Sequence, residues 1–115
     1  MADAPRISVD EVKKRMDAGE KFTFVDVRNP QAWAGSDSML PGAIRLTVDN
    51  AEEKLPKIPK DRPIVAYCTS PSEGSSASLA QKLQKLGYKD VWALQGGFDA
   101  WQNAGLSLEK RREVA

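Results

Sequence analysis

Residues 64–76 read Ile64-Val65-Ala66-Tyr67-Cys68-Thr69-Ser70-Pro71-Ser72-Glu73-Gly74-Ser75-Ser76. The first four are almost wholly apolar, which is typical of a short strand buried in a parallel sheet. A loop of small polar residues follows, and beyond it Ala80, Leu83 and Leu86 recur at helical spacing on one face. The segment therefore predicts a strand, a loop and a helix, with Cys68 at the carboxyl end of the strand.

Another helix is predicted nearer the start of the chain, over residues 8–19. Ser8 is suited to cap its first turn, and Glu11, three residues later, completes the pattern of a capping box. Gly19 is placed to end the helix. The apolar stripe expected to face the core consists of Val9, Val12 and Met16.

The rest of the chain continues this alternation of strand-like and helix-like segments. Strands are expected over residues 22–27, 43–46 and 91–94, a brief helix over 48–55 that stops before Pro56, and a closing helix over 98–104. The charged residues 109–115 are expected to fray. The alternation is the pattern of an α/β domain built around a mainly parallel sheet.

The composition is that of an ordinary soluble domain. The chain has 115 residues, 41% hydrophobic and 29% charged, and its 17 basic and 16 acidic residues leave a formal net charge of +1. This length supports one core, so we expect a single domain over residues 1–115. Basic and acidic residues are interleaved, which argues against nucleic-acid binding. No apolar stretch approaches the ~20 residues of a membrane span, and the start is not that of a secretory signal. We therefore expect a cytoplasmic protein with no membrane partner, and a monomer.

Two absences from the sequence restrict the chemistry. The chain has no histidine, which excludes a Ser-His-Asp or Cys-His pair and any zinc site with histidine ligands. It has one cysteine, which excludes an intramolecular disulfide, a CxxC redox pair and a cysteine-cluster metal site. We therefore expect no metal and no cofactor.

Cys68 is the candidate nucleophile. Ligands of open α/β sheets bind beyond the carboxyl ends of the strands, where helix N-termini present backbone N–H groups. Such donors favour thiolate over thiol, and the thiolate is the nucleophilic form. The alternative is that Cys68 is a small core residue, as buried cysteines often are. Its position beside the loop favours catalysis, so we expect Cys68 to be at least partly exposed.

Four motifs in sequence order give the chain a family resemblance. They are Asp26-Val27-Arg28, Leu40-Pro41-Gly42-Ala43-Ile44, Tyr67-Cys68 and Leu94-Gln95-Gly96-Gly97-Phe98-Asp99-Ala100-Trp101. Over nearly its whole length the chain resembles a single-domain rhodanese, the family of thiosulfate-type sulfurtransferases. The resemblance implies a three-layer α/β sandwich with about five mostly parallel strands and helices on both faces.

The same resemblance implies a sulfurtransferase that passes sulfane sulfur through a persulfide on Cys68. The donor would be a small sulfur-donor anion or a persulfide, and the acceptor a thiol or another thiophilic group. Asp26 and Arg28 are expected to support the loop after their own strand, through a charge pair or backbone hydrogen bonds, and a direct role in substrate binding is the less favoured alternative. The substrate-binding loop would consist of Thr69, Ser70, Pro71, Ser72, Glu73, Gly74 and Ser75.

The loop departs from the family pattern because it contains no Arg or Lys, whereas the common rhodanese loop runs Cys-x-x-Gly-x-Arg. We therefore expect weak activity with thiosulfate, which is a dianion. Glu73 has two interpretations: its carboxylate stabilises the start of the following helix, or it borders the pocket and repels anions. Both count against tight binding of thiosulfate.

Two other functions compete with sulfur transfer. A non-catalytic binding or regulatory domain would keep the fold while recognising a partner protein or a thiol-bearing ligand. Phosphatase or arsenate-reductase chemistry is less favoured, because a transferring phosphoryl group needs an Arg clamp where this loop has Glu73. The large aromatic residues are expected to pack in the core or at its rim; they are Trp33, Trp92, Phe98 and Trp101.

Overall fold

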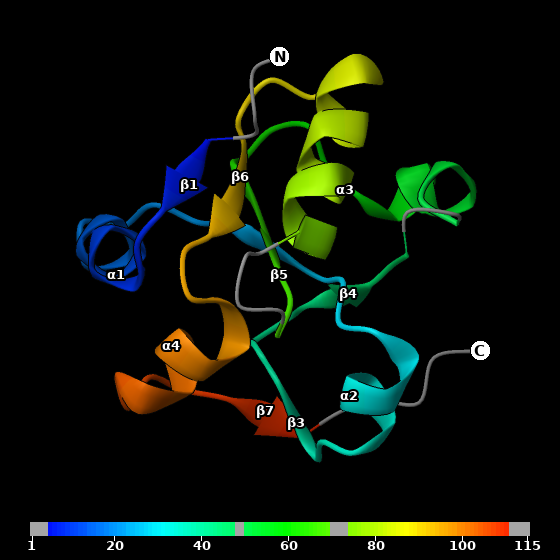
Figure 1. Ribbon diagram of the computed structural model, residues 1–115. Helices are drawn as coiled ribbons and strands as arrows, with labels where there is room; N and C mark the ends of the chain where they lie inside the picture. Colours follow the sequence, from blue (N-terminus) through cyan, green and yellow to red (C-terminus); the bar gives the residue numbers. More distant parts are fainter. Residues whose placement is uncertain (1–4, 48–49, 70–73, 111–115) are drawn as a thin grey trace.

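The sheet is parallel and has five strands within the part of the chain that the computed structural model describes, residues 5–47, 50–69 and 74–110. The strands are β1 (Arg6–Ile7), β2 (Thr23–Asp26), β4 (Ile44–Arg45), β5 (Ile64–Tyr67) and β6 (Val91–Leu94). Their order across the sheet is β1-β6-β5-β2-β4, and every neighbouring pair is parallel (Figure 1). The predicted α/β fold with a mainly parallel sheet is confirmed.

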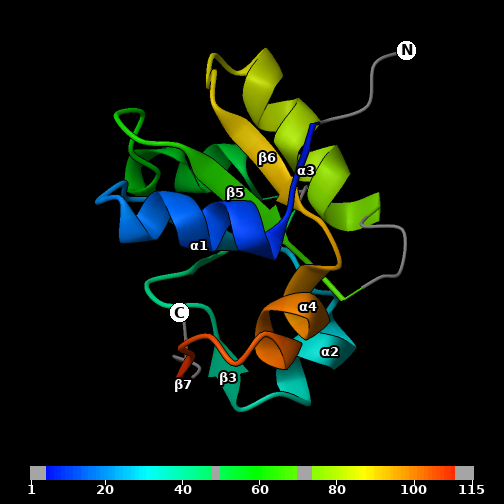
Figure 2. The same cartoon turned by 90° about the vertical axis from the view of Figure 1, so that its left-hand side faces the viewer.

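Helices cover both faces of this sheet (Figure 2). They are α1 (Val9–Asp17), α2 (Pro30–Ala34), the 3-10 helix η1 (Glu52–Lys57), α3 (Gly74–Lys85) and α4 (Gly97–Asn103). Residues of α1 and α4 pack on one face, and residues of α3 pack on the other. No helix in the described part of the chain is both long and apolar enough to cross a membrane.

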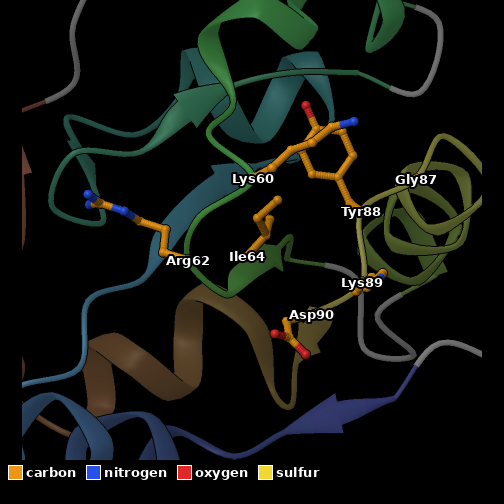
Figure 3. Close-up of a pocket in the computed structure, with 7 residues that line it drawn as sticks. All are labelled: Lys60, Arg62, Ile64, Gly87, Tyr88, Lys89 and Asp90. Atoms are coloured by element: carbon orange, nitrogen blue, oxygen red, sulfur yellow. The ribbon is translucent and has the colours of Figure 1, made fainter.

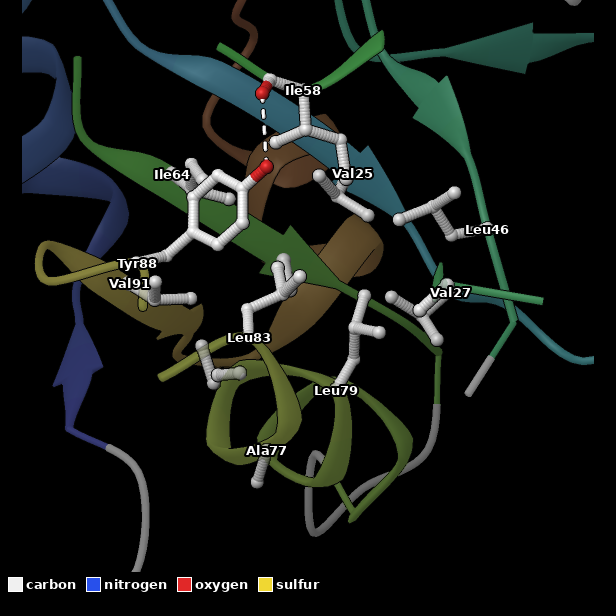
Figure 4. Packing of buried hydrophobic residues seen from close by; sticks show 14 residues of the cluster. Val25, Val27, Leu46, Ile58, Ile64, Ala77, Leu79, Leu83, Tyr88 and Val91 are labelled. Atoms are coloured by element: carbon white, nitrogen blue, oxygen red, sulfur yellow. Dashed lines mark hydrogen bonds between the residues drawn. The ribbon is translucent and has the colours of Figure 1, made fainter. Parts of the chain in front are cut away.

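The two faces of the sheet each carry an apolar core. Side chains alternate along a strand, so neighbouring residues point to opposite faces. Val25 of β2 packs toward α3 with Leu83, in the cluster shown in Figure 4. Phe24 packs on the opposite face, where its ring meets Trp101 of α4 edge to face at 5.2 Å. Burial on both faces explains why β5 reads as a continuous apolar run.

Helix α1 begins as the sequence predicts, but its apolar stripe is shorter. Ser8 Oγ accepts a hydrogen bond from the backbone N–H of Glu11 at 3.1 Å, while the Glu11 carboxylate accepts one from Arg15 Nε at 3.0 Å. Val9 and Val12 are buried, whereas Met16 is 39% exposed. The prediction that Met16 faces the core is therefore wrong. In the last turn of α1, Met16 borders a surface groove instead.

The segment before β5 differs from the prediction in its end point. A helix was expected to stop before Pro56, and the 3-10 helix η1 instead continues through Pro56 to Lys57. In so short a helix, a proline near the end removes few hydrogen bonds. The helix also begins later than expected, at Glu52, because residues 50 and 51 form a turn; residues 48 and 49 lie outside the described residues.

The end of the described chain is paired rather than frayed. Strand β7 (Glu109–Lys110) is antiparallel to β3 (Ser38–Met39), with Ser38 opposite Lys110 and Met39 opposite Glu109. The expectation of fraying is therefore wrong for residues 109 and 110, and residues 111–115 lie outside the described residues. This ribbon lies close to α2 and α4, below the carboxyl end of β5 in Figure 1.

Candidate functional site

Cys68 follows β5 directly, at the carboxyl end of the sheet where the sequence places it. Its side chain is only 2% exposed, so the expectation that it is at least partly exposed is wrong. The thiol donates a hydrogen bond to the hydroxyl of Ser76, with 3.5 Å between Sγ and Oγ. Ser76 lies in the first turn of α3 and is completely buried. The candidate nucleophile is thus held against a buried hydroxyl at a helix N-terminus.

The Gly96-Gly97 pair brings α4 against the backbone of Cys68. The N–H of Phe98 donates to the carbonyl oxygen of Cys68 at 2.9 Å. Gly97 has a φ of +60°, and a side chain at this position would collide with that same carbonyl oxygen. Glycine is therefore required at position 97 for both its backbone conformation and its lack of a side chain. Through this contact α4 packs against Cys68 from the side opposite α3, the helix that follows the loop.

A buried ion pair lies one strand away from Cys68. Arg28 and Asp26 are 1% and 0% exposed, and Arg28 Nη2 lies 2.7 Å from Asp26 Oδ2. The guanidinium also donates through Nε to both carboxylate oxygens, at 3.1 Å and 3.0 Å. The backbone N–H of Arg28 donates to Oδ1 at 3.0 Å. Asp26 and Arg28 therefore form the charge pair that the sequence suggests, in a fork geometry that Lys cannot reproduce.

Tyr67 links this ion pair to the strand that carries Cys68. Its hydroxyl donates to Asp26 Oδ2 at 2.7 Å and accepts the N–H of Leu40 at 3.1 Å. Burial, with the nearby Asp26 carboxylate, raises the pKa of Tyr67 well above its ordinary value. The phenol therefore stays neutral and continues to donate its hydrogen bond to Asp26 throughout the physiological pH range.

The same network holds the segment that contains β3. Arg28 Nη2 donates to the backbone carbonyl of Ser38 at 2.8 Å, and Tyr67 receives the N–H of Leu40. The guanidinium also lies over the ring of Phe98, 4.5 Å from its centroid. Arg28 thus contacts β2, the β3 segment and α4 at the carboxyl end of the sheet.

Arg45 is a second cation at this end of the sheet, and it was not predicted from the sequence. Its Nη1 donates to the carbonyl oxygen of Asp26 at 3.2 Å and lies 3.8 Å from Asp26 Oδ1. The guanidinium is stacked over Trp33, 4.9 Å from the ring centroid, and the side chain is 11% exposed. Burial lowers the pKa of Arg45, and Asp26 partly offsets this effect. A lone Arg ending a two-residue strand carries no sequence signal for this position.

The predicted loop residues are only partly described. Thr69 is half-buried after Cys68, and Gly74 and Ser75 are exposed at the start of α3. Ser70, Pro71, Ser72 and Glu73 lie outside the described residues. Ser76 was not predicted, because a serine in a run of small polar residues does not reveal which hydroxyl turns inward. Among the described residues, no group of three or more Cys, Asp or Glu side chains is placed to hold a metal ion.

The large aromatic side chains lie where packing was expected. Phe98 and Trp101 are buried in the core on the α1 face, and Trp33 and Trp92 are half-buried against it. The guanidinium groups of Arg28 and Arg45 both lie over the ring of Trp33. These aromatic residues therefore serve in packing, and Trp33 in addition contacts both arginines at the carboxyl end of the sheet.

Comparison with known proteins identifies proteins that are similar to this chain in sequence and in fold. A sequence model described as the rhodanese-like domain matches residues 8–104. A protein named sulfurtransferase from Allochromatium vinosum is 32% identical over 102 residues, covering 89% of this chain and 92% of that protein. The crystal structure of a rhodanese-like domain protein from Staphylococcus aureus is 25% identical, with a TM-score of 0.73. That similarity covers 94% of this chain and 99% of the other.

A longer relative contains a similar region. The probable adenylyltransferase/sulfurtransferase MoeZ of Mycobacterium tuberculosis is 35% identical over 102 residues, which cover 87% of this chain. The chain spans only 25% of the length of that relative. The similarity therefore concerns one region of that protein and not its whole activity.

Proposed function

The chain belongs to the rhodanese-like domain family, and from that premise we propose that it is a sulfurtransferase that carries sulfane sulfur on Cys68. The observation that carries the proposal is the contact between the Cys68 thiol and the buried Ser76 hydroxyl, at the carboxyl end of a central strand. Its known relatives include a protein of similar length named sulfurtransferase. The loop residues Thr69–Ser75 would surround the transferred sulfur.

The chemistry needs one nucleophile and hydrogen-bond donors, without a metal or an organic cofactor. The Cys68 thiolate attacks the outer sulfur of a donor persulfide, forms a new S–S bond and releases the donor as a thiolate. An acceptor thiolate then attacks the outer sulfur of the Cys68 persulfide, takes it and leaves the Cys68 thiolate. Ser76 and the N–H groups at the start of α3 are suited to stabilise sulfur anions in both steps.

The charges near the site favour a donor of low charge over thiosulfate. Residues 69–76 contain no Arg or Lys. The two cations of the neighbouring strands, Arg28 and Arg45, both bind Asp26. Arg28 is also almost completely buried. Thiosulfate carries two negative charges and would gain little from these paired guanidinium groups. A persulfide carries less charge, so its binding depends less on cations at the site.

The burial of Cys68 defines how the proposal must be tested. The folded protein is incubated with an inorganic polysulfide, and its intact mass is measured before and after treatment with a reducing thiol. We expect a gain of one sulfur atom that the thiol removes, and no gain in Cys68→Ser. Failure of the folded wild-type protein to gain sulfur, while the unfolded protein reacts, would support the alternative of a non-catalytic domain.

A further inference from the structure

A cavity of about 340 Å³ is lined by residues at the amino ends of two central strands (Figure 3), whereas Cys68 follows the carboxyl end of β5. It is formed where the chain leads into β5 and β6, whose amino ends are adjacent because Ile64 pairs with Val91. The backbone N–H of Ile64 donates to the carbonyl oxygen of Asp90 at 2.8 Å and holds the starts of these two strands together. The lining combines buried Ile64 and Tyr88 with four charged residues, Lys60, Arg62, Lys89 and Asp90.

The charge of this lining is unbalanced. Three cations and one carboxylate leave an excess of two positive charges in one cavity, although the whole chain carries a formal net charge of only +1. Within the described residues, Lys60 and Lys89 have no carboxylate within ion-pair distance. Arg62 lies 3.6 Å from Asp61, which is 76% exposed, and such surface pairs are weak.

Lys60 is held in place without being neutralised. Its ammonium group lies 5.0 Å from the centroid of the Tyr88 ring, and Figure 3 shows its side chain extending across that ring. The ring is itself fixed, because the Tyr88 hydroxyl donates to the carbonyl oxygen of Ile58 at 3.0 Å. A cation over an aromatic face keeps its positive charge for a further ligand.

We propose that this cavity binds a small polyanion of the phosphate or phosphomonoester class. Its volume falls at the lower end of the range of small-molecule sites, which is about 300–1,000 Å³. Ammonium groups bind phosphate as point charges, and Lys60 and Lys89 supply two of them, whereas the guanidinium of Arg62 is directed away from Lys60 in Figure 3. Inorganic phosphate and a phosphomonoester share this chemistry, and the difference between them lies in whether the organic part contacts Ile64 and Tyr88.

The cavity is separate from the cysteine site and does not depend on the proposed sulfur transfer. Lys60 and Arg62 precede β5, and Cys68 follows its other end. Four residue steps along a strand, from Ile64 to Cys68, span about 13 Å. An anion in this cavity therefore leaves Cys68 unobstructed.

The test is a titration of the isotopically labelled full chain with inorganic phosphate, pyrophosphate and a phosphomonoester at constant ionic strength, followed by amide NMR. We expect saturable shifts at Gly87, Lys89 and Asp90, with pyrophosphate binding more tightly than phosphate because it carries more charge. A phosphomonoester that binds more tightly than phosphate would identify the organic part as a contact. Absence of saturation up to about 10 mM pyrophosphate, a concentration that detects even weak affinity, would overturn the proposal.

Charge variants decide whether the cavity residues are responsible. Lys60→Gln/Lys89→Gln should weaken pyrophosphate binding roughly fivefold, since two exposed charge contacts are lost. The matched control is Lys14→Gln/Lys110→Gln, which removes the same charge from exposed positions outside the lining and should leave binding nearly unchanged. Equal weakening in both double variants would mean that only net charge matters and would overturn the site.

Asp90→Asn is expected to increase binding, a result that misfolding of the variant would not produce. Removing the one carboxylate of the lining should tighten pyrophosphate binding roughly threefold. Unchanged or weaker binding in this variant would contradict the proposed position of the anion.

A hexaglutamate peptide is a further probe. If it bound more tightly than pyrophosphate and responded to the same variants, the cavity would instead be a docking surface for an acidic protein segment.

Discussion

The thiol of Cys68 and the hydroxyl of Ser76 face each other at 3.5 Å between strand β5 and helix α3, and both side chains are buried. Removing a hydroxyl that stabilises a sulfur anion should slow the reaction of that sulfur more than it disturbs folding. We expect Ser76→Ala to form the Cys68 persulfide roughly fivefold more slowly than the wild type. Stopped-flow or quenched mass spectrometry with polysulfide measures this rate.

The neighbouring serine supplies a matched control for that variant. Ser75 is exposed in the same turn of α3, so Ser75→Ala changes the helix start without touching a buried hydroxyl. Equal rates of persulfide formation in Ser76→Ala, Ser75→Ala and the wild type would assign Ser76 a purely structural role.

Gly97 is predicted to tolerate no side chain. Its φ of +60° strains any other residue, and an added Cβ would meet the carbonyl oxygen of Cys68. We expect Gly97→Ala to lower the free energy of unfolding by about 2–3 kcal/mol and to displace α4 from Cys68. Gly105 has a φ of +74° with open space around it, so Gly105→Ala should lose only about 1 kcal/mol. Equal losses in urea denaturation would show that the contact with Cys68 adds nothing to the backbone strain.

The Asp26–Arg28 ion pair predicts a strong asymmetry between single and double variants. Arg28→Met leaves the carboxylate of Asp26 buried without its main partner, which should lower the free energy of unfolding by about 3–5 kcal/mol. Asp26→Asn/Arg28→Met removes both charges and should recover part of that loss. Lys13→Met is the control, because the Lys13–Asp17 pair is exposed and should contribute only about 0.5 kcal/mol. A double variant less stable than Arg28→Met would contradict this account.

Tyr67 should make the protein sensitive to alkali. Its folded pKa is raised above the unfolded value of 10.0, so the native state holds a proton that the unfolded state releases above that pH. The raised pKa therefore contributes its full stabilisation only below pH 10.0. The free energy of unfolding should fall as the pH rises above that value. In Tyr67→Phe the bonds to Asp26 and Leu40 are lost at every pH, but this pH dependence is lost too. The stability gap between wild type and Tyr67→Phe should narrow above pH 10.0 in urea titrations, and a constant gap would refute the argument.

The strands predicted best from the sequence are those that can be identified from their own residues, without knowledge of the strand they pair with. Ile64–Tyr67 and Val91–Leu94 are continuous apolar runs bounded by turn residues, and both have the predicted limits. Strands β3 and β7 have two residues each and exist only through their mutual pairing, which joins positions about seventy residues apart in sequence. Local pattern carries no information about such a pair.

The candidate site was predictable in the same uneven way. The position of Cys68 follows from the strand that precedes it, and the two-residue spacing of Arg28 from Asp26, the last residue of β2, allows their pairing. The burial of Cys68 was not predictable, because it results from α4 and α3 closing on it through Gly97 and Ser76. Contacts between distant elements, and not local propensity, determine how accessible a side chain is.

The last prediction concerns the charge of the loop and the choice of sulfur donor. Glu73 lies outside the described residues, directly before Gly74, the first residue of α3. If its carboxylate is near the donor and water screens it, the carboxylate opposes anions by about 1 kcal/mol or less. Glu73→Gln should then raise the rate with thiosulfate a few-fold, and Glu73→Arg should raise it further by supplying the missing cation, while the rate with a persulfide donor changes less. Cys68→Ser must abolish transfer in each background, and Glu53→Gln, an exposed acidic residue of η1, controls for net charge. If both Glu73 variants keep the wild-type ratio of thiosulfate to persulfide rates but lose about 1 kcal/mol of stability, the carboxylate stabilises the helix start and does not select the donor.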